Sequence, residues 1–318
     1  MLVGELVKIN PTKEVGLKDI KRLGYSECKI YQYNYKFGKP NVEGKILKEY
    51  VVCDKEENSI TEYFLSGYLK GGKKVFRYEG NNKLSESNWY DKSGDMYGNA
   101  YYVYNDKGQL VKEGKRRNYD ARDWEARTFE YQDNGSLLIE EKWVSNGMGG
   151  DLWLGAVYKY NDLGLLKEEI RYRKPGILWT KELYEYDDKN SKIKIIWYDG
   201  DGELSKINTY QNNDRGLEIE CVSKYAGRSG GNSRRVSNYN DIGLVTDYTS
   251  YDEENKRSTK TEYKYDDRGS IAEVTYFDDK DEIIFGCKYK YNDKDLLIEK
   301  TKYGSMKEPL TTVIYEFE

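Results

Sequence analysis

The feature that most limits how this chain folds is a tyrosine-rich unit that recurs about every 26 residues. A clear copy runs from Tyr102 to Leu110 and reads Tyr-Val-Tyr-Asn-Asp-Lys-Gly-Gln-Leu. Counterparts of its Asp106 lie at Asp133, Asp162, Asp188, Asp214, Asp241, Asp267 and Asp293, with spacings of 27, 29, 26, 26, 27, 26 and 26 residues. A fixed period of this length predicts a chain built from stacked copies of one supersecondary unit.

Each copy predicts a β-hairpin. The Tyr-x-Tyr pair alternates with polar residues, which is the pattern of a strand with one buried face. The following Asn-Asp-x-Gly favours a type I turn with a bulge, because glycine tolerates the positive φ that this turn requires. An outgoing strand such as Leu166–Tyr172 then reaches a second turn such as Asp199–Gly202. One unit is therefore two antiparallel strands and two turns.

The expected fold is all-β, with little or no helix. We expect an elongated antiparallel β-hairpin repeat, either a meander or a spiral solenoid, with a period of about 26 residues. Residues 1–30 are predicted to be an N-terminal cap, in which Val15–Leu23 is a weak helix candidate. Residues 31–318 are predicted to form a single domain of about ten repeats. The open edge strands of such a sheet could pair with another chain.

The composition excludes several classes of function. Histidine is absent, so Ser-His-Asp and Cys-His mechanisms and histidine-containing zinc sites are excluded. The net charge of −4 provides no basic field for nucleic acid, and no apolar run approaches the roughly 18 residues of a transmembrane segment. We predict no catalytic residue, no metal site and no cofactor, and therefore a protein that is not an enzyme.

The four cysteines show no metal-ligand spacing. They are Cys28, Cys53, Cys221 and Cys287, and none belongs to a CxxC pair. Cys28 and Cys53 are separated by about one repeat, so a disulfide between neighbouring repeats is one interpretation. Small buried residues with free thiols are the favoured interpretation.

At the repeat residues the chain resembles bacterial YD-repeat (RHS-like) proteins, whose signature is Tyr-x-Tyr-Asp-x-x-Gly-x-Leu. The segments Lys29–Gly38 and Lys48–Asp54 resemble the start of repeat-containing bacterial surface lipoproteins. The pattern is also similar, more weakly, to MORN-type repeats. The resemblance implies a β-hairpin repeat fold at the cell surface. The position after the turn glycine holds Gln109, Ser136, Leu165 and Ser270, where toxin-encapsulating members of the class carry arginine.

Four aromatic residues form the candidate ligand-binding site. Tyr97, Trp124, Trp153 and Trp179 each lie nine positions before the aspartate of their repeat. The buried tyrosine pair lies at even offsets, so in an unbulged strand this odd offset predicts the opposite face. Equivalent residues about 9.6 Å apart could then stack on the sugar rings of a polysaccharide. The alternative is that a bulge changes the register and these rings pack at the sheet margin.

A row of acidic residues is a second pattern. Glu168, Glu220, Asp247, Glu273 and Glu299 each follow the turn hydrophobe by two positions. Such a row could bind cations or supply paired carboxylates to a glycosidase. Cross-strand ion pairs with lysine and arginine are the favoured interpretation.

We therefore predict a non-catalytic scaffold or binding module at a bacterial cell surface, with a polysaccharide or another protein as its partner. The alternative is a cytosolic MORN-like scaffold or an immunity or antitoxin-type partner protein, and a carbohydrate-active enzyme is favoured less. Residues 1–10 lack the features of a signal peptide. The expected location is the cell surface or the extracellular space if a leader was removed from this chain, and the cytoplasm otherwise.

Overall fold

The computed structural model describes residues 23–36, 39–41, 44–80, 83–117, 123–146, 151–227 and 231–318. These residues contain β-strands and no α-helix, which confirms the all-β expectation. Residues 15–22 of the candidate helix, and most of the predicted cap, lie outside the described residues. No helix in the described part of the chain is long and apolar enough to cross a membrane.

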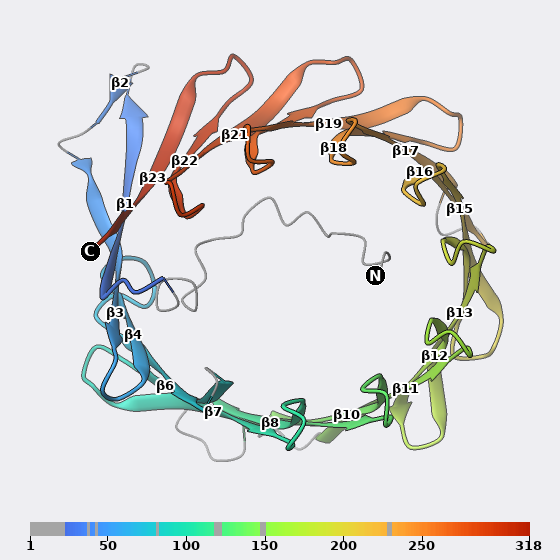
Figure 1. The fold of residues 1–318 in the computed structure, drawn as a ribbon, viewed down its shortest axis with the longest axis horizontal. Coiled ribbons are helices and arrows are strands. Elements are labelled where there is room, and N and C mark those ends of the chain that lie inside the picture. The colour runs from blue at the N-terminus through green and yellow to red at the C-terminus, as the bar shows by residue number, and fades with distance from the viewer. Residues whose placement is uncertain are drawn as a thin grey trace. The chain divides into compact units, whose positions relative to one another are not determined.

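The strands follow one another along the chain at close intervals (Figure 1). Their bounds are β1 Glu27–Lys36, β2 Lys39–Pro40, β3 Ile46–Asp54, β4 Ser59–Phe64, β5 Lys73–Glu79, β6 Lys83–Tyr90, β7 Met96–Tyr104, β8 Leu110–Arg117, β9 Asp123–Tyr131, β10 Leu137–Asn146, β11 Asp151–Tyr160, β12 Leu166–Lys174, β13 Ile177–Tyr186, β14 Lys192–Tyr198, β15 Leu204–Asn212, β16 Glu218–Tyr225, β17 Ser233–Tyr239, β18 Val245–Tyr251, β19 Arg257–Tyr265, β20 Ile271–Phe277, β21 Ile283–Tyr291, β22 Leu297–Tyr303 and β23 Pro309–Phe317.

The chain divides into two compact units. The first unit comprises residues 1–50, 186–194 and 207–318, and the second comprises residues 51–185 and 195–206. The candidate site described below lies in the second unit.

The repeat turns have the predicted geometry. After β11, the amide of Asn161 donates to the carbonyl of Leu165 at 2.9 Å, and the amide of Gly164 donates to the carbonyl of Asn161 at 2.9 Å. Gly164 has a φ of 76°, and the strand register shifts next to Tyr160 as a bulge requires. The Asn161 side chain accepts the amide of Leu165 at 2.9 Å, which explains why asparagine or aspartate begins these turns.

The expected open, elongated solenoid is wrong. Within the first unit, β1 pairs antiparallel with β23 from Cys28↔Phe317 to Asn34↔Thr311. The amide of Ser26 also donates to the carbonyl of Glu318 at 2.8 Å, and Lys29 and Glu318 form an ion pair of 2.8 Å. The first and last strands, which a meander or solenoid would leave as free edges, lie side by side (Figure 1). The fold is therefore a closed antiparallel sheet, in which strand edges satisfy each other's backbone groups.

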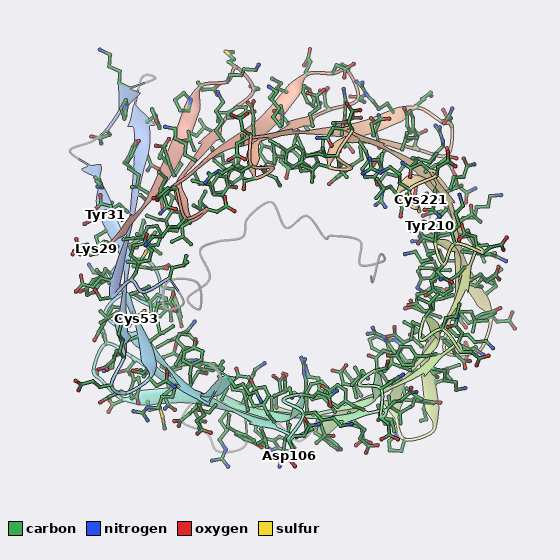
Figure 2. All side chains as sticks on the ribbon, viewed as in Figure 1. Lys29, Tyr31, Cys53, Asp106, Tyr210 and Cys221 are labelled. Atoms are coloured by element: carbon green, nitrogen blue, oxygen red, sulfur yellow. The ribbon has the colours of Figure 1, made fainter. Side chains whose placement is uncertain are left out.

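Tyrosine supplies several of the buried side chains. Side chains extend from both faces of the strands, and the face that carries the Tyr-x-Tyr pairs is called the tyrosine face here (Figure 2). On it, the second tyrosine of a pair donates its hydroxyl to a main-chain carbonyl at the start of an earlier strand. These bonds are Tyr104 to Leu84 (3.0 Å), Tyr131 to Leu110 (2.7 Å), Tyr160 to Leu137 (2.7 Å), Tyr239 to Glu218 (2.7 Å), Tyr265 to Val245 (2.7 Å) and Tyr291 to Ile271 (2.9 Å).

Glycine opposite an aromatic residue provides further packing. Tyr101 pairs in register with Gly114, and a Cβ atom on Gly114 would lie 2.2 Å from the Tyr101 ring. Tyr303 pairs with Gly286 in the same way, and a Cβ atom on Gly286 would lie 2.2 Å from the Tyr303 ring. The ring therefore lies directly over the partner strand, which buries aromatic surface within a thin sheet.

The cysteines follow the favoured interpretation. Cys28, Cys53, Cys221 and Cys287 are all buried thiols and none forms a disulfide, so the alternative of a disulfide between Cys28 and Cys53 is wrong.

Candidate functional site

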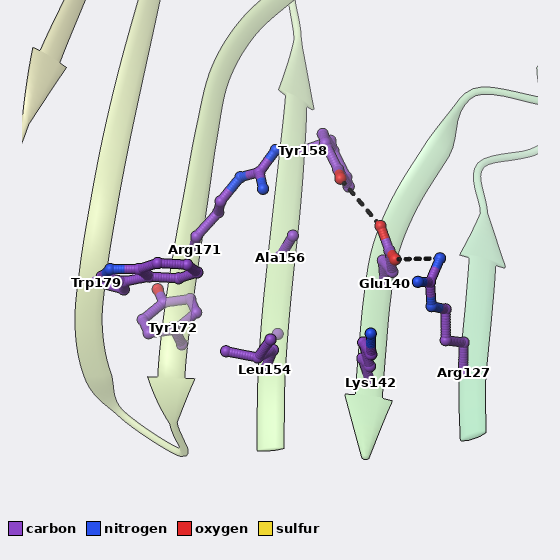
Figure 3. A pocket seen from close by; sticks show the side chains of 10 residues that line it. Arg127, Glu140, Lys142, Leu154, Ala156, Tyr158, Arg171, Tyr172 and Trp179 are labelled. Carbon is purple, nitrogen blue, oxygen red and sulfur yellow. Dashed lines mark hydrogen bonds and ion pairs between the residues drawn. The ribbon is translucent and has the colours of Figure 1, made fainter. Parts of the chain in front are cut away.

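A pocket of about 200 Å³ opens on the tyrosine face of the second unit. It spans five consecutive strands, β9 to β13, and is called the β9–β13 pocket here (Figure 3). The side chains that matter for its chemistry are those of Arg127, Glu140, Lys142, Tyr158, Arg171 and Trp179. Leu154, Gly155 and Ala156 of β11 also line it.

Strand register brings these residues together. Lys142 of β10 pairs with Arg127 of β9 and with Leu154 of β11. Ala156 of β11 pairs with Glu140 of β10 and with Arg171 of β12. Residues paired across a ladder share one face, so the charged groups surround the small side chain of Ala156. The short side chain at this central position leaves room for the pocket.

The basic groups of the pocket have acidic partners. Arg127 Nε lies 3.4 Å from Glu113 Oε1 and 3.3 Å from Glu125 Oε1, and its Nη1 lies 3.9 Å from Glu140. Lys142 Nζ lies 3.1 Å from Glu125. Arg127 Nε makes no well-aligned hydrogen bond although it is buried, so its partners hold it by charge rather than by directed bonds.

Arg171 is held from one side. Its Nε donates to Glu169 Oε1 at 2.5 Å, while the guanidinium extends beside the Tyr158 ring (Figure 3). Burial is the largest single influence and lowers the pKa of Arg171, but the Glu169 carboxylate, together with Tyr158 and Glu182, raises it overall. Arg171 therefore keeps its positive charge at the pocket.

The remaining polar groups have defined protonation states near neutral pH. Burial, assisted by Glu169 and Glu140, raises the pKa of Tyr158, so its hydroxyl stays protonated and donates to Glu140 Oε2 at 3.4 Å. Burial opposes ionisation of Glu125, but the hydrogen bond and charge of Lys142 lower its pKa overall. The pocket thus offers cationic donors, one carboxylate acceptor in Glu140 and a neutral phenol ring.

The structure distributes the four predicted aromatic residues between different settings. Trp179 lies at a register shift in β13, lines the β9–β13 pocket and is 46% exposed. Tyr97 lies at a register shift in β7, with its ring centroid 6.3 Å from that of Trp89. The bulges that the alternative interpretation required are therefore present in these two strands.

The other two predicted residues lie in regular ladders. Trp124 pairs with Arg116 and with Ser145. It lies three positions before the pocket residue Arg127 in the same strand, so it belongs to the opposite face of the sheet. Trp153 pairs in register with Trp143, and its side chain lies outside the described residues. The ligand-binding role of the four aromatic residues stays a prediction.

Sequence reasoning missed the charged residues of the pocket. Arg127, Glu140, Lys142 and Arg171 occupy the tyrosine-face phase of strands β9, β10 and β12, where an apolar residue is expected. Charged residues at a buried phase in three adjacent strands were the available signal. Glu140 with Lys142 and Glu169 with Arg171 also repeat the pattern of Glu113 and Lys115, a glutamate and a base seven and nine positions after the repeat aspartate, so the periodicity itself carried this signal.

Four of the five acidic residues form the expected cross-strand ion pairs with lysine or arginine, and Asp247 instead accepts a hydrogen bond from the Asn238 amide. Glu168 lies 2.6 Å from Lys159 and 2.8 Å from Lys181. The other contacts are Glu273 with Lys264 (2.8 Å), Glu299 with Lys290 (3.0 Å), Asp247 with Asn238 (2.9 Å), and Glu220 with Arg234. No group of three or more metal-ligating side chains gathers in the described ranges.

Comparison with known proteins gives only distant similarities. No protein-family model and no curated protein sequence matches the chain. The crystal structure of TcdB2-TccC3-Cdc42 has 8% identity and a TM-score of 0.29, covering 84% of this chain and 20% of the other. The Photorhabdus luminescens Tc holotoxin pore has 10% identity and a TM-score of 0.31, covering 86% and 16%.

A porin-like protein from Bacteroides uniformis is a further similar structure. Its identity is 10% and its TM-score is 0.32, covering 92% of this chain and 98% of the other. This chain spans a fifth or less of the two toxin chains, but nearly all of the porin-like chain. Structural neighbours thus include Tc toxin components and porin-like proteins, and membership of the YD-repeat class stays a prediction.

Proposed function

We propose that the protein is a non-catalytic carbohydrate-binding protein, and that the β9–β13 pocket receives one sugar unit of a polysaccharide. The observation that carries this proposal is Trp179, whose indole is 46% exposed at the edge of a pocket lined by Arg171, Lys142 and Glu140. Exposing a large aromatic ring beside convergent polar groups is typical of ligand sites.

The chemistry of the lining suits a sugar. The flat indole of Trp179 can cover the apolar face of a pyranose ring, while charged donors and a carboxylate acceptor bond its hydroxyl groups. Pockets that enclose drug-sized ligands have volumes of about 300–1,000 Å³. The smaller volume of about 200 Å³ favours a single ring or a chain end.

Glycan-array binding followed by isothermal titration calorimetry tests this proposal. We expect Trp179→Ala to weaken binding of the recognised glycan at least tenfold, because the stacking surface is lost. We expect Trp124→Ala, which removes the same ring from the opposite face, to retain wild-type affinity. Thermal unfolding of both variants checks that the fold is intact.

Other results would contradict the proposal. Loss of binding in Trp124→Ala and Trp153→Ala, with Trp179→Ala unaffected, would make the predicted aromatic row the site instead of the pocket. Absence of binding to any glycan on the array by the wild-type protein would exclude carbohydrate binding as the function.

A further inference from the structure

The β9–β13 pocket presents more positive than negative charge to a ligand. Three bases, Arg127, Lys142 and Arg171, line it together with Glu140. Glu140 lies 3.9 Å from Arg127, and the other carboxylates that contact these bases are Glu113, Glu125 and Glu169. These other carboxylates lie on the same face as the bases, since Glu113 pairs with Arg127 and Glu169 pairs with Tyr158, but they are not part of the lining that a ligand contacts.

Arg171 is the base with free bonding capacity. Glu169 accepts a hydrogen bond from its Nε, and neither of its Nη atoms donates a hydrogen bond to a described residue. Its side chain is 48% exposed. A guanidinium is planar and can hold a carboxylate through two parallel N–H bonds. The two Nη atoms of Arg171 can therefore bind the carboxylate of a ligand.

We propose that the pocket selects a sugar that carries a carboxylate, namely a hexuronate unit of an acidic polysaccharide. This inference rests on the proposed function and specifies its ligand. The Trp179 indole covers the ring, the Nη atoms of Arg171 bind the carboxylate, and Lys142 adds a second positive charge. Glu140 and the Tyr158 hydroxyl, which are joined by a hydrogen bond of 3.4 Å, keep lone pairs that can accept hydrogen bonds from the ring hydroxyl groups.

The test compares hexuronate oligosaccharides with their methyl esters, which keep the same rings but carry no charge. Calorimetry on the wild-type protein should show at least tenfold tighter binding of the acid form, as a charge-assisted bond predicts. Arg171→Gln should weaken binding of the acid form at least fivefold more than binding of the ester, so that most of this preference is lost. Arg171→Lys, which retains the positive charge but not the planar pair of N–H donors, should keep part of the preference.

Arg77→Gln is the matched control. Arg77 lies between Phe76 and Tyr78 in β5, away from the pocket. Its side chain is 51% exposed and lies 3.5 Å from Glu86, so it is an exposed arginine with a carboxylate partner, as Arg171 is. We expect this variant to bind both forms as the wild-type protein does. Thermal unfolding of each variant shows whether a lost preference reflects a lost fold.

The outcomes separate the two proposals. Equal affinity of the wild-type protein for acid and ester contradicts selection of an anionic sugar, but leaves carbohydrate binding in place. An acid preference that Arg171→Gln retains contradicts the assigned contact. No binding of either form contradicts this inference, and a neutral glycan bound on the array would then show that the proposed function stands without it.

Discussion

At the scale of single residues, the second tyrosine of each pair contributes both its apolar ring and its polar hydroxyl to the fold. Its ring adds buried aromatic area to a thin sheet, and its hydroxyl satisfies a main-chain carbonyl about 20 residues earlier. Where the repeat has Asn212 in place of tyrosine, the amide Nδ2 donates to the carbonyl of Lys192 at 3.0 Å and preserves the bond without the ring. The requirement is therefore for a donor as well as for apolar area.

Tyr291→Phe tests this requirement and its pH dependence. The hydroxyl of Tyr291 donates to Ile271 at 2.9 Å, so its loss should lower the free energy of unfolding by about 1 kcal/mol at pH 7. Burial raises the pKa of Tyr291 to about 12, above the value of about 10 for an unfolded chain. The contribution is thus present below pH 10 and is lost as the pH rises towards 12.

Urea unfolding at several pH values measures the effect. The deficit of Tyr291→Phe relative to the wild-type protein should shrink between pH 10 and 12, because phenylalanine has no proton to lose. Tyr101→Phe is the control, since Tyr101 is 41% exposed and its ring contact with Gly114 is kept. A deficit of Tyr291→Phe that is constant with pH would contradict the linkage.

At the scale of single elements, the turn after each Tyr-x-Tyr strand depends on one residue with positive φ. Glycine occupies this position at Gly108, Gly135 and Gly164, but Asn190 and Asp295 occupy it in other repeats. The left-handed conformation costs an L-residue about 1–2 kcal/mol, less for asparagine, which forms local hydrogen bonds. The hairpin is therefore specified by the turn even where glycine is replaced.

Gly164→Ala and Asn190→Gly form a pair of opposite changes at this position. Gly164 has a φ of 76° and no heavy atom within 4 Å of an added Cβ, so the alanine variant should lose about 1 kcal/mol through backbone strain alone. Asn190 has a φ of 64°, and glycine there should be neutral or stabilising. Urea denaturation gives both values, and equal losses in the two variants would contradict the role of the turn.

At the scale of the whole molecule, pairing of β1 with β23 decides the fold class. An open sheet would leave alternate backbone amides of its last strand exposed to water. In this protein β23 has β22 on one side and β1 on the other. Closure therefore removes the exposed edges that would otherwise pair with another chain.

Hydrogen exchange followed by NMR tests closure directly. We expect the amides of residues 311–317 in β23 to exchange uniformly slowly, at rates similar to those of β20, which is paired on both sides. The physical reason is that a strand with two neighbours has every amide bonded. Alternating fast and slow amides along β23 would instead show a free edge and restore the open architecture.

The sequence by itself determined the hairpins, the turns and the use of tyrosine. These depend on residues within about 26 positions of each other, so the alternation of Tyr102 and Tyr104 and the turn at Gly108 are readable from a single repeat. The tertiary structure alone decided closure, because the contact between Ile30 and Tyr315 spans nearly the whole chain and no local pattern records it. It also decided the site, since the bulge at Trp179 and the register of Arg171 with Ala156 arise from pairing between strands.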